Sequence, residues 1–248
     1  YVQHVHPPDE LPAERYCVPP AVISFLNNKA NLGELVPAGA VPRRCVVEMA
    51  AIRRAPPDLP CVIKVATDDS TGGGAAVAVC RGTGDLERAI TRFHGVDRLV
   101  VEEYLEIERS FCLHFAAFAG GRVEYLGAAE QVCGQDGSYD GNWLDGTAMP
   151  DEAILPALHA VERAAARGYY GFAGIDVAFT PRGPFVLDIN ARFNGSSAPI
   201  LLFDAIRASR GAVVMRSHRW ALESADWEAA VERAIDAGRL VPKCIYDP

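Results

Sequence analysis

Apolar and polar positions alternate through much of the chain and predict antiparallel strands. Short runs of this kind, separated by turns rich in Gly, Pro or Asp, are typical of hairpins. We expect strands over residues 61–66, 75–80, 98–105, 109–119, 122–129, 174–179 and 184–189. A further short strand is expected over residues 45–49.

Segments with a helical spacing of apolar residues lie between these strands. We expect helices over residues 21–35, 85–93, 151–167, 200–209 and 225–237. Several begin at an Asp or end at a Gly, which are favourable residues at helix ends. Hairpins interleaved with helices predict an α+β fold in two lobes.

Composition narrows the class of protein. Half of the 248 residues are hydrophobic, which is ample for a packed core, and no apolar run reaches the ~20 residues of a membrane span. The net charge of −8 argues against general nucleic-acid binding, which needs a basic surface. The seven cysteines include no Cys-X-X-Cys pair, which favours buried, reduced thiols in a cytoplasmic protein.

A hairpin with an acidic residue on each strand is the strongest local signal. Its turn, at residues 181–183, joins a strand that contains Asp176 to a strand that contains Asp188. A three-residue loop would pair Thr180 with Pro184 and place the two carboxylates opposite each other on one face. Facing carboxylates repel each other, so this arrangement favours a cation between them.

Two further polar residues share this face, because side chains alternate across a strand. Asn190 and Arg192 follow Asp188 at intervals of two residues. Carboxylate and amide oxygens are ligands that suit Mg²⁺, so Asp176, Asp188 and Asn190 are candidate metal ligands. Arg192 could hold phosphate oxygens or a developing negative charge. The alternative, an ordinary solvated sheet face, is disfavoured by the apolar flanks.

Lys64 interrupts an apolar run and precedes a glycine-rich turn. A buried ammonium needs an anion beside it, although a strand could instead expose it to water. The turn contains Gly72-Gly73-Gly74, whose backbone N–H groups can approach phosphates. It is not a P-loop, because no Gly-Lys-Ser/Thr follows and the next element is a strand. Together with the acidic hairpin, the lysine and the glycines favour a phosphate site.

The strand over residues 98–105 ends in acidic and aromatic residues. Adenine needs a flat apolar slot with one or two hydrogen bonds at its edge. Backbone groups near Glu103 and Leu105 could supply these bonds, and Glu108 could accept from ribose hydroxyls. An ordinary strand with an exposed acidic end is an equal alternative for this segment.

Taken in chain order, these elements resemble the ATP-grasp superfamily. The matching segments lie between residues 28 and 200, and the most specific is Asp188-Ile189-Asn190-Ala191-Arg192, followed by Gly195-Ser196. The resemblance implies an α+β ATP-grasp fold, with antiparallel sheets and packed helices in two lobes around the nucleotide. Residues 39–104 would form the small lobe and 105–248 the large lobe. Residues 1–38 would be a lead-in and helix after an N-terminal domain absent here, so we expect a fragment.

The resemblance also implies a role for each candidate residue. Nucleotide binding would fall to Lys29, Lys64, Ser70, Gly72, Gly73, Gly74, Glu102, Glu103, Tyr104, Leu105 and Glu108. One or two Mg²⁺ ions, or Mn²⁺ in their place, would be bound by Asp176, Asp188 and Asn190. Lys64 and Arg192 would act in catalysis, with Arg192 stabilising the transferred phosphoryl group.

Three positions depart from the family pattern. Asp188 stands where Glu is usual, and Ala191 replaces a frequent Pro. Glu108 follows Glu102 by six residues, whereas the ribose acid normally follows by about seven. The first and third departures leave the metal geometry and the ribose role open.

The reaction implied by the resemblance has two steps. A carboxylate attacks the γ-phosphate of ATP to give an acylphosphate, and an amine then displaces phosphate to give an amide. Within the family, a short chain with this ending resembles amino-acid or peptide ligases. We therefore expect a cytoplasmic ATP-dependent carboxylate–amine ligase with small-molecule substrates, without nucleic-acid or membrane partners, and with a homodimer left open. The alternatives are carboxylation, thioester formation or phosphoryl transfer by the same fold, or a nucleotide-binding module without turnover.

Overall fold

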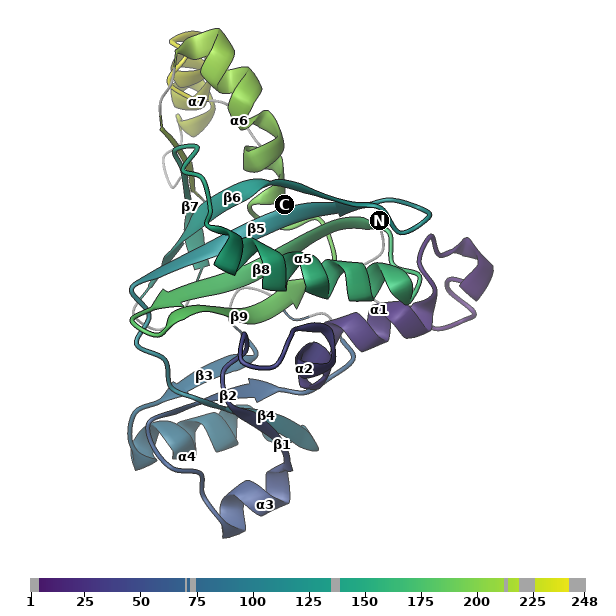
Figure 1. The fold of residues 1–248 in the computed structure, drawn as a ribbon. Helices are drawn as coiled ribbons and strands as arrows, with labels where there is room; N and C mark the ends of the chain where they lie inside the picture. Colours follow the sequence, from purple (N-terminus) through teal and green to yellow (C-terminus); the bar gives the residue numbers. More distant parts are fainter. Residues whose placement is uncertain are drawn as a thin grey trace.

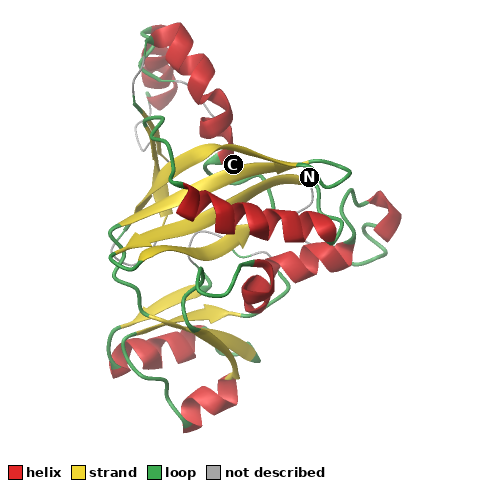
Figure 2. Cartoon of the chain, in the orientation of Figure 1, coloured by secondary structure: helices red, strands yellow, loops and turns green. Residues whose placement is uncertain are grey.

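Two antiparallel sheets, each with helices packed on it, form the two lobes of the molecule (Figures 1 and 2). The computed structural model describes residues 5–69, 71, 75–134, 139–211, 214–218 and 226–240. Both the α+β class and the division into two sheets are confirmed. None of the helices in this described part of the chain is long and apolar enough to cross a membrane.

The small lobe is a four-stranded sheet, at the bottom of Figure 1. Its strands lie in the order β1 (Arg44–Glu48), β4 (Arg98–Glu103), β2 (Cys61–Val65) and β3 (Val77–Cys80). Helices α3 (Met49–Arg54) and α4 (Thr83–Arg92) cover the face that points away from the large lobe. Alternate strand residues such as Ile63 and Leu99 bury themselves against these helices. Lys64 and Glu102 therefore lie on the opposite face, toward the large lobe.

The large lobe is a six-stranded antiparallel sheet. Its order is β10 (Met215–His218), β7 (Tyr139–Leu144), β6 (Val123–Cys133), β5 (Arg109–Ala117), β8 (Gly171–Thr180) and β9 (Gly183–Asn190). Helix α5 (Asp151–Ala166) lies along one face, where its small Ala157, Ala160 and Ala164 pack onto large strand residues such as Phe115 and Ile175. Helix α6 (Ser197–Arg210) packs on β6 and β7 through Phe203, and α7 (Trp227–Asp236) follows β10. The face opposite α5 carries the acidic residues of β8 and β9.

The N-terminal segment is less regular than the sequence predicts. The helix expected over residues 21–35 is divided into α1 (Pro20–Asn27), the 3₁₀ helix η2 (Lys29–Asn31) and α2 (Leu32–Leu35), after a short η1 (Ala13–Arg15). Asn28 interrupts it, because its backbone is extended and its side chain accepts a hydrogen bond from the Ala30 N–H. The interruption places Lys29 at the start of η2. Helix α3 and strands β7 and β10 were not predicted.

Six cysteines in the described part of the chain are free thiols. Cys61, Cys80 and Cys112 are buried, as their apolar surroundings predict. The expectation of buried thiols is wrong for three others, which are exposed: Cys17, Cys45 and Cys133.

Gly174 of β8 lies where no larger residue fits. A Cβ atom at this position would lie 2.8 Å from Cys112 Sγ and would also collide with the side-chain amide of Asn194. We expect Gly174→Ala to lower the free energy of unfolding by about 1–3 kcal/mol, the usual result of overpacking. In the matched control Gly33→Ala, nothing lies within 4 Å of the added Cβ. Since Ala also favours helix, thermal denaturation should show no loss there. Equal melting temperatures for the two variants would contradict this packing.

Candidate functional site

Asp176 and Asp188 face each other across β8 and β9, as the sequence predicts. The route to this pairing differs from the expected one. Thr180 pairs with Gly183, so the loop has two residues instead of three, and the expected Thr180–Pro184 pair is wrong. The register then shifts between Asp176 and Val177 of β8, which leaves Leu187 of β9 as an extra residue. This one-residue bulge restores the pairing of the two acids.

The two facing carboxyl groups have different environments. Asp176 accepts hydrogen bonds from Gln131 Nε2 at 3.0 Å and from Asn190 Nδ2 at 3.1 Å. Burial, followed by the charge of Asp188, raises the pKa of Asp176 to about 6. Burial also acts to raise the pKa of Asp188, but the charges of Lys29 and Lys64 outweigh it and hold that pKa below its ordinary value. Asp188 is thus the more acidic of the two carboxyl groups.

Two lysines from different parts of the sequence meet the β9 strand. Lys29 Nζ forms an ion pair with Asp188 Oδ2. Lys64 Nζ lies 2.7 Å from Glu102 Oε2 and donates to the carbonyl oxygen of the bulge residue Leu187 at 2.8 Å. Lys64 is only 6 % exposed, so the alternative of a solvent-exposed lysine on the strand is wrong.

Two neighbouring acids at the end of β4 point to opposite faces of the sheet. Glu102 is buried, between Lys64 and the guanidinium of Arg44. Glu103 points the other way and accepts from the backbone and side chain of Arg43, with Arg182 at 3.1 Å. Burial acts to raise the pKa of Glu103, but these hydrogen bonds hold it below its ordinary value. Of these two acids only Glu103 is partly exposed, and it begins the segment 103–108 that links the two sheets, here called the hinge.

A hollow of about 270 Å³ borders this hinge segment. It is lined by Glu103, Tyr104, Glu106, Thr180, Pro181 and Arg182. Tyr104 is exposed there, whereas the next residue, Leu105, is buried. Glu108 is exposed, and its backbone N–H donates to the carbonyl of Phe179 in β8. The hinge residues expected at the nucleotide base thus lie next to the turn of the acidic hairpin.

Arg192 reaches from the large lobe to the small lobe. It follows β9, and its Nη2 donates to the carbonyl oxygen of Thr71 at 3.2 Å. Thr71 belongs to the glycine-rich tip between β2 and β3. The other tip residues expected to bind phosphate lie outside the described residues: Ser70, Gly72, Gly73 and Gly74.

Several polar residues near the acids were not identified from the sequence. Gln131 of β6 bridges Asp176 and Ser110, and Arg44 of β1 contacts Glu102. The alternation of side chains along a strand determines which face of the sheet Gln131 and Arg44 occupy. Their contacts with the acids, however, depend on the register between neighbouring strands. No sequence signal distinguishes them from other polar residues on strands.

A buried cysteine and histidine lie next to this polar region. Cys112 Sγ is 3.4 Å from His114 Nε2 on the same face of β5. Burial raises the pKa of the Cys112 thiol well above its ordinary value, and it lowers the pKa of His114 to about 4. Both groups are therefore neutral near pH 7, so this pair is not a thiolate nucleophile.

The chemistry of the donors fits a hard divalent cation. Two carboxylates and an amide from one hairpin provide oxygen ligands, which Mg²⁺ prefers. Among the described residues, no group of three or more His, Cys, Asp or Glu side chains is arranged to hold a metal. A cation here would therefore need ligands from a substrate or water, as Mg²⁺ with a nucleotide has.

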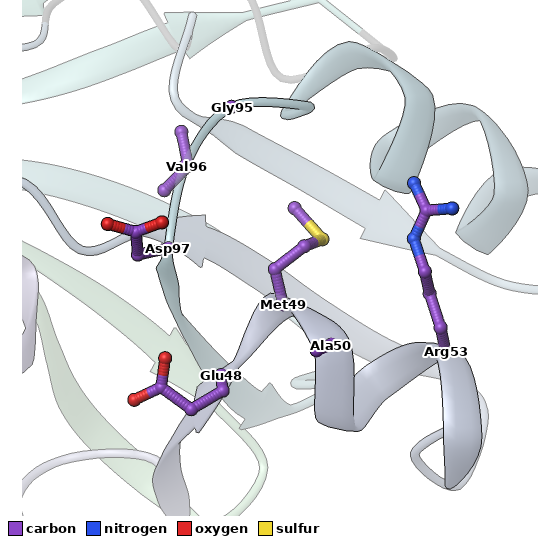
Figure 3. A pocket seen from close by; sticks show the side chains of 7 residues that line it. All are labelled: Glu48, Met49, Ala50, Arg53, Gly95, Val96 and Asp97. Carbon is purple, nitrogen blue, oxygen red and sulfur yellow. The ribbon is translucent and has the colours of Figure 1, made fainter.

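Another hollow lies on the far side of the small lobe, near α3 and the start of β4 (Figure 3). It encloses about 360 Å³ and is lined by Glu48, Met49, Ala50, Arg53, Gly95, Val96 and Asp97. None of the expected site residues lines it, so we do not assign it to the site.

Solved structures of several enzymes share this fold. N5-carboxyaminoimidazole synthetase from Staphylococcus aureus, complexed with ADP, is 15% identical over 77% of this chain and 52% of its own, with a TM-score of 0.61. L-amino acid ligase from Bacillus licheniformis is 17% identical over 75% of this chain and 48% of its own, with a TM-score of 0.56. The biotin carboxylase domain of Hydrogenobacter thermophilus 2-oxoglutarate carboxylase, complexed with MgADP, is 18% identical over 70% of this chain and 41% of its own, with a TM-score of 0.53. This chain spans about half the length, or less, of these proteins.

A match to a family model identifies the family of this chain, whereas the structural similarities show only its fold. The matching model is that of the ATP-grasp L-aspartate–L-methionine ligases, and the match runs over residues 42–190. It includes the hinge, both facing aspartates, Lys64 and Asn190, and it covers more than half of the 248 residues. The chain therefore belongs to the ATP-grasp family of L-aspartate–L-methionine ligases.

Proposed function

We propose that the chain binds MgATP between its lobes and activates a carboxylate as an acylphosphate, which an amine converts to an amide. The observation that carries this proposal is the convergence of two buried lysines on the strand that bears one of two facing aspartates. ATP-grasp enzymes use ATP, and the family name supports amino acids as the substrate class for both the carboxylate and the amine. Residues 39–104 and 105–248 remain the proposed lobes.

Lys29 and Lys64 would bind the phosphates. In the structure both ammonium groups contact oxygen atoms of β9, a carboxylate and a backbone carbonyl respectively. Phosphate oxygens would supply equivalent acceptors with more negative charge, so these contacts support an exchange of partners on binding. The glycine-rich tip with Ser70, Gly72, Gly73 and Gly74 would close over the same phosphates.

Asp176, Asp188 and Asn190 would hold the magnesium that accompanies ATP, one ion or two. Magnesium bound there would neutralise charge on the phosphate oxygens. The pKa of Asp188 is held below its ordinary value, and a cation between the carboxyl groups would lower the raised pKa of Asp176. The proposed site is therefore matched in charge to a divalent ion.

The nucleoside would lie at the hinge. Adenine would lie near Glu103, Tyr104 and Leu105, with Glu108 at the ribose. The hollow beside Glu103 and Tyr104 supports the position of this site, although Leu105 and Glu108 do not line it. Glu102 would act here through Lys64, because its carboxylate contacts that ammonium and is buried.

Positioning and charge stabilisation would perform the first chemical step. The substrate carboxylate oxygen would attack the γ-phosphorus in line, and ADP would leave. The amine would then attack the acyl carbon, lose a proton, and expel phosphate. Arg192, on the face of the facing aspartates, would stabilise the charge that develops on the transferred phosphoryl group.

Melting temperatures measured with and without divalent metal test the binding proposal. We expect MgATP at 100-fold excess over Kd to stabilise the protein by about 2.7 kcal/mol. EDTA should remove most of this gain, and Asp188→Asn should lose the metal-dependent part. Equal stabilisation by ATP with and without metal would show that the metal assignment is wrong.

Product analysis tests the reaction itself. We would incubate the protein with MgATP and pooled amino acids, measure ADP release, and identify the product by mass spectrometry. A ligase should release ADP over many turnovers only with both amino-acid substrates present and should form an amide. Binding of MgATP without ADP release would instead favour a nucleotide-binding module.

A further inference from the structure

Arg44 lies at the start of β1, opposite Glu102 of β4 in the sheet register. Its Nη1 is 3.4 Å from Glu102 Oε1, and its Nη2 donates to the backbone carbonyl of Lys29. The Arg44 side chain is only 11% exposed. One guanidinium therefore contacts both the residue that pairs with Lys64 and the backbone of Lys29.

These contacts continue into a closed ring that joins the lobes. Glu102 Oε2 lies 2.7 Å from Lys64 Nζ, which donates to the Leu187 carbonyl. Lys29 Nζ pairs with Asp188, the next residue of β9. Both lysines thus end on neighbouring residues of one strand. Arg44 connects the two lysines, because it contacts the Lys29 carbonyl directly and Lys64 through Glu102.

Stability alone does not account for a buried arginine here. Among the residues that the structure describes, Arg44 Nη1 and Glu102 Oε1 have no hydrogen-bond partner of suitable geometry, although both are buried. Burial lowers the pKa of the Arg44 guanidinium, and the charges of Glu102 and Asp188 act against this. Apolar residues often stabilise a protein as well as such a buried ion pair does. An apolar residue could not make the two polar contacts of the guanidinium, with Glu102 and with the Lys29 carbonyl.

We infer that Arg44 is a positioning residue for ATP binding, which orients Lys29 through its carbonyl and Lys64 through Glu102. The inference rests on the proposed function, because it takes the two lysines as the phosphate-binding groups. A planar guanidinium reaches two acceptors at a fixed separation, whereas an ammonium is a single point charge. Arg44→Lys therefore keeps the charge and loses the connection.

The test compares Arg44→Lys with Arg88→Lys in MgATP binding. Arg88 of α4 is an exposed arginine of the same lobe, 76% accessible and paired with Asp85, so it is a matched control. We expect Arg44→Lys to raise the Kd for MgATP, measured by calorimetry, roughly 10-fold or more, since small misplacements of binding groups have large effects. The KM for ATP should rise accordingly while kcat falls less, and Arg88→Lys should change neither.

A double-mutant cycle separates positioning from folding. If Arg44 acts through Lys64, the increase in Kd caused by Arg44→Lys should become smaller in a Lys64→Ala background. An equal increase in both backgrounds, or a lower melting temperature with unchanged Kd, overturns the inference and leaves the proposed function standing. Failure of the wild-type protein to bind MgATP overturns the proposed function and the inference together.

Discussion

Replacing Arg192 with alanine is expected to lower kcat by roughly 10²- to 10³-fold and to leave the affinity for MgATP nearly unchanged. Arg192 follows the strand that bears Asp188 and contacts the small lobe through the Thr71 carbonyl. A cation beside the proposed metal site suits a charge that appears during the reaction. Removing an interaction made chiefly in the transition state lowers kcat and has little effect on ground-state binding. Rates of ADP release and calorimetric Kd values would measure the two effects.

Asp188→Asn gives the contrasting result that makes this experiment specific. It removes charge from the proposed metal site and from the partner of Lys29, so MgATP affinity and turnover should fall together. Arg122→Ala is a suitable control, because Arg122 is an exposed arginine paired with Glu124 on the β5–β6 hairpin. Near-normal turnover in Arg192→Ala, in an assay where Asp188→Asn is inactive, would make Arg192 a structural residue. The proposed MgATP binding would survive that result.

Replacing Lys64 with alanine is expected to weaken MgATP binding by about 10- to 100-fold, the effect of losing one hydrogen bond from a charged group. Lys64→Arg should not restore the affinity. The ammonium fits between Glu102 Oε2 at 2.7 Å and the Leu187 carbonyl at 2.8 Å, in a buried position. A planar guanidinium is larger and cannot occupy the same point.

Melting temperatures without nucleotide are the control for Lys64, because its removal also leaves Glu102 with Arg44 as its remaining cation in the ring. Lys64→Met keeps most of the volume of the side chain and separates packing from charge. Unchanged MgATP affinity in a folded Lys64→Ala protein would assign Lys64 to the ion pair with Glu102 alone.

Alternation and turn residues predicted most of the strands of the two sheets. The predictions failed where local sequence and tertiary pairing disagree. Residues Tyr139–Leu144 form β7, although Asp140-Gly141-Asn142 reads as a turn, because pairing with β6 and β10 holds this segment extended. The helix expected over residues 21–35 breaks at Asn28, whose side chain competes for a backbone N–H.

The candidate site was predictable where one short segment carries several polar groups. Asp176 and Asp188 share a hairpin, so alternation indicated their common face. The expected loop was one residue too long and the bulge at Leu187 was not expected, but these two errors cancelled. Lys64 was conspicuous because it interrupts an apolar run and precedes a glycine-rich turn. Arg44 and Gln131 gave no such signal, since their contacts depend on strand order and on the meeting of the lobes.

The ring of contacts also has a consequence for how the chain folds. The bond from Lys29 to Asp188 joins residues 159 positions apart, and that from Lys64 to Leu187 spans 123 positions. Closing loops of this length is entropically unfavourable until other contacts hold the ends near each other. The pairs of consecutive strands, β2–β3 in the small sheet and β5–β6, β6–β7 and β8–β9 in the large sheet, can form their local contacts earlier. The proposed nucleotide site should therefore be among the last parts of the molecule to form during folding, and the first to be lost when the lobes separate.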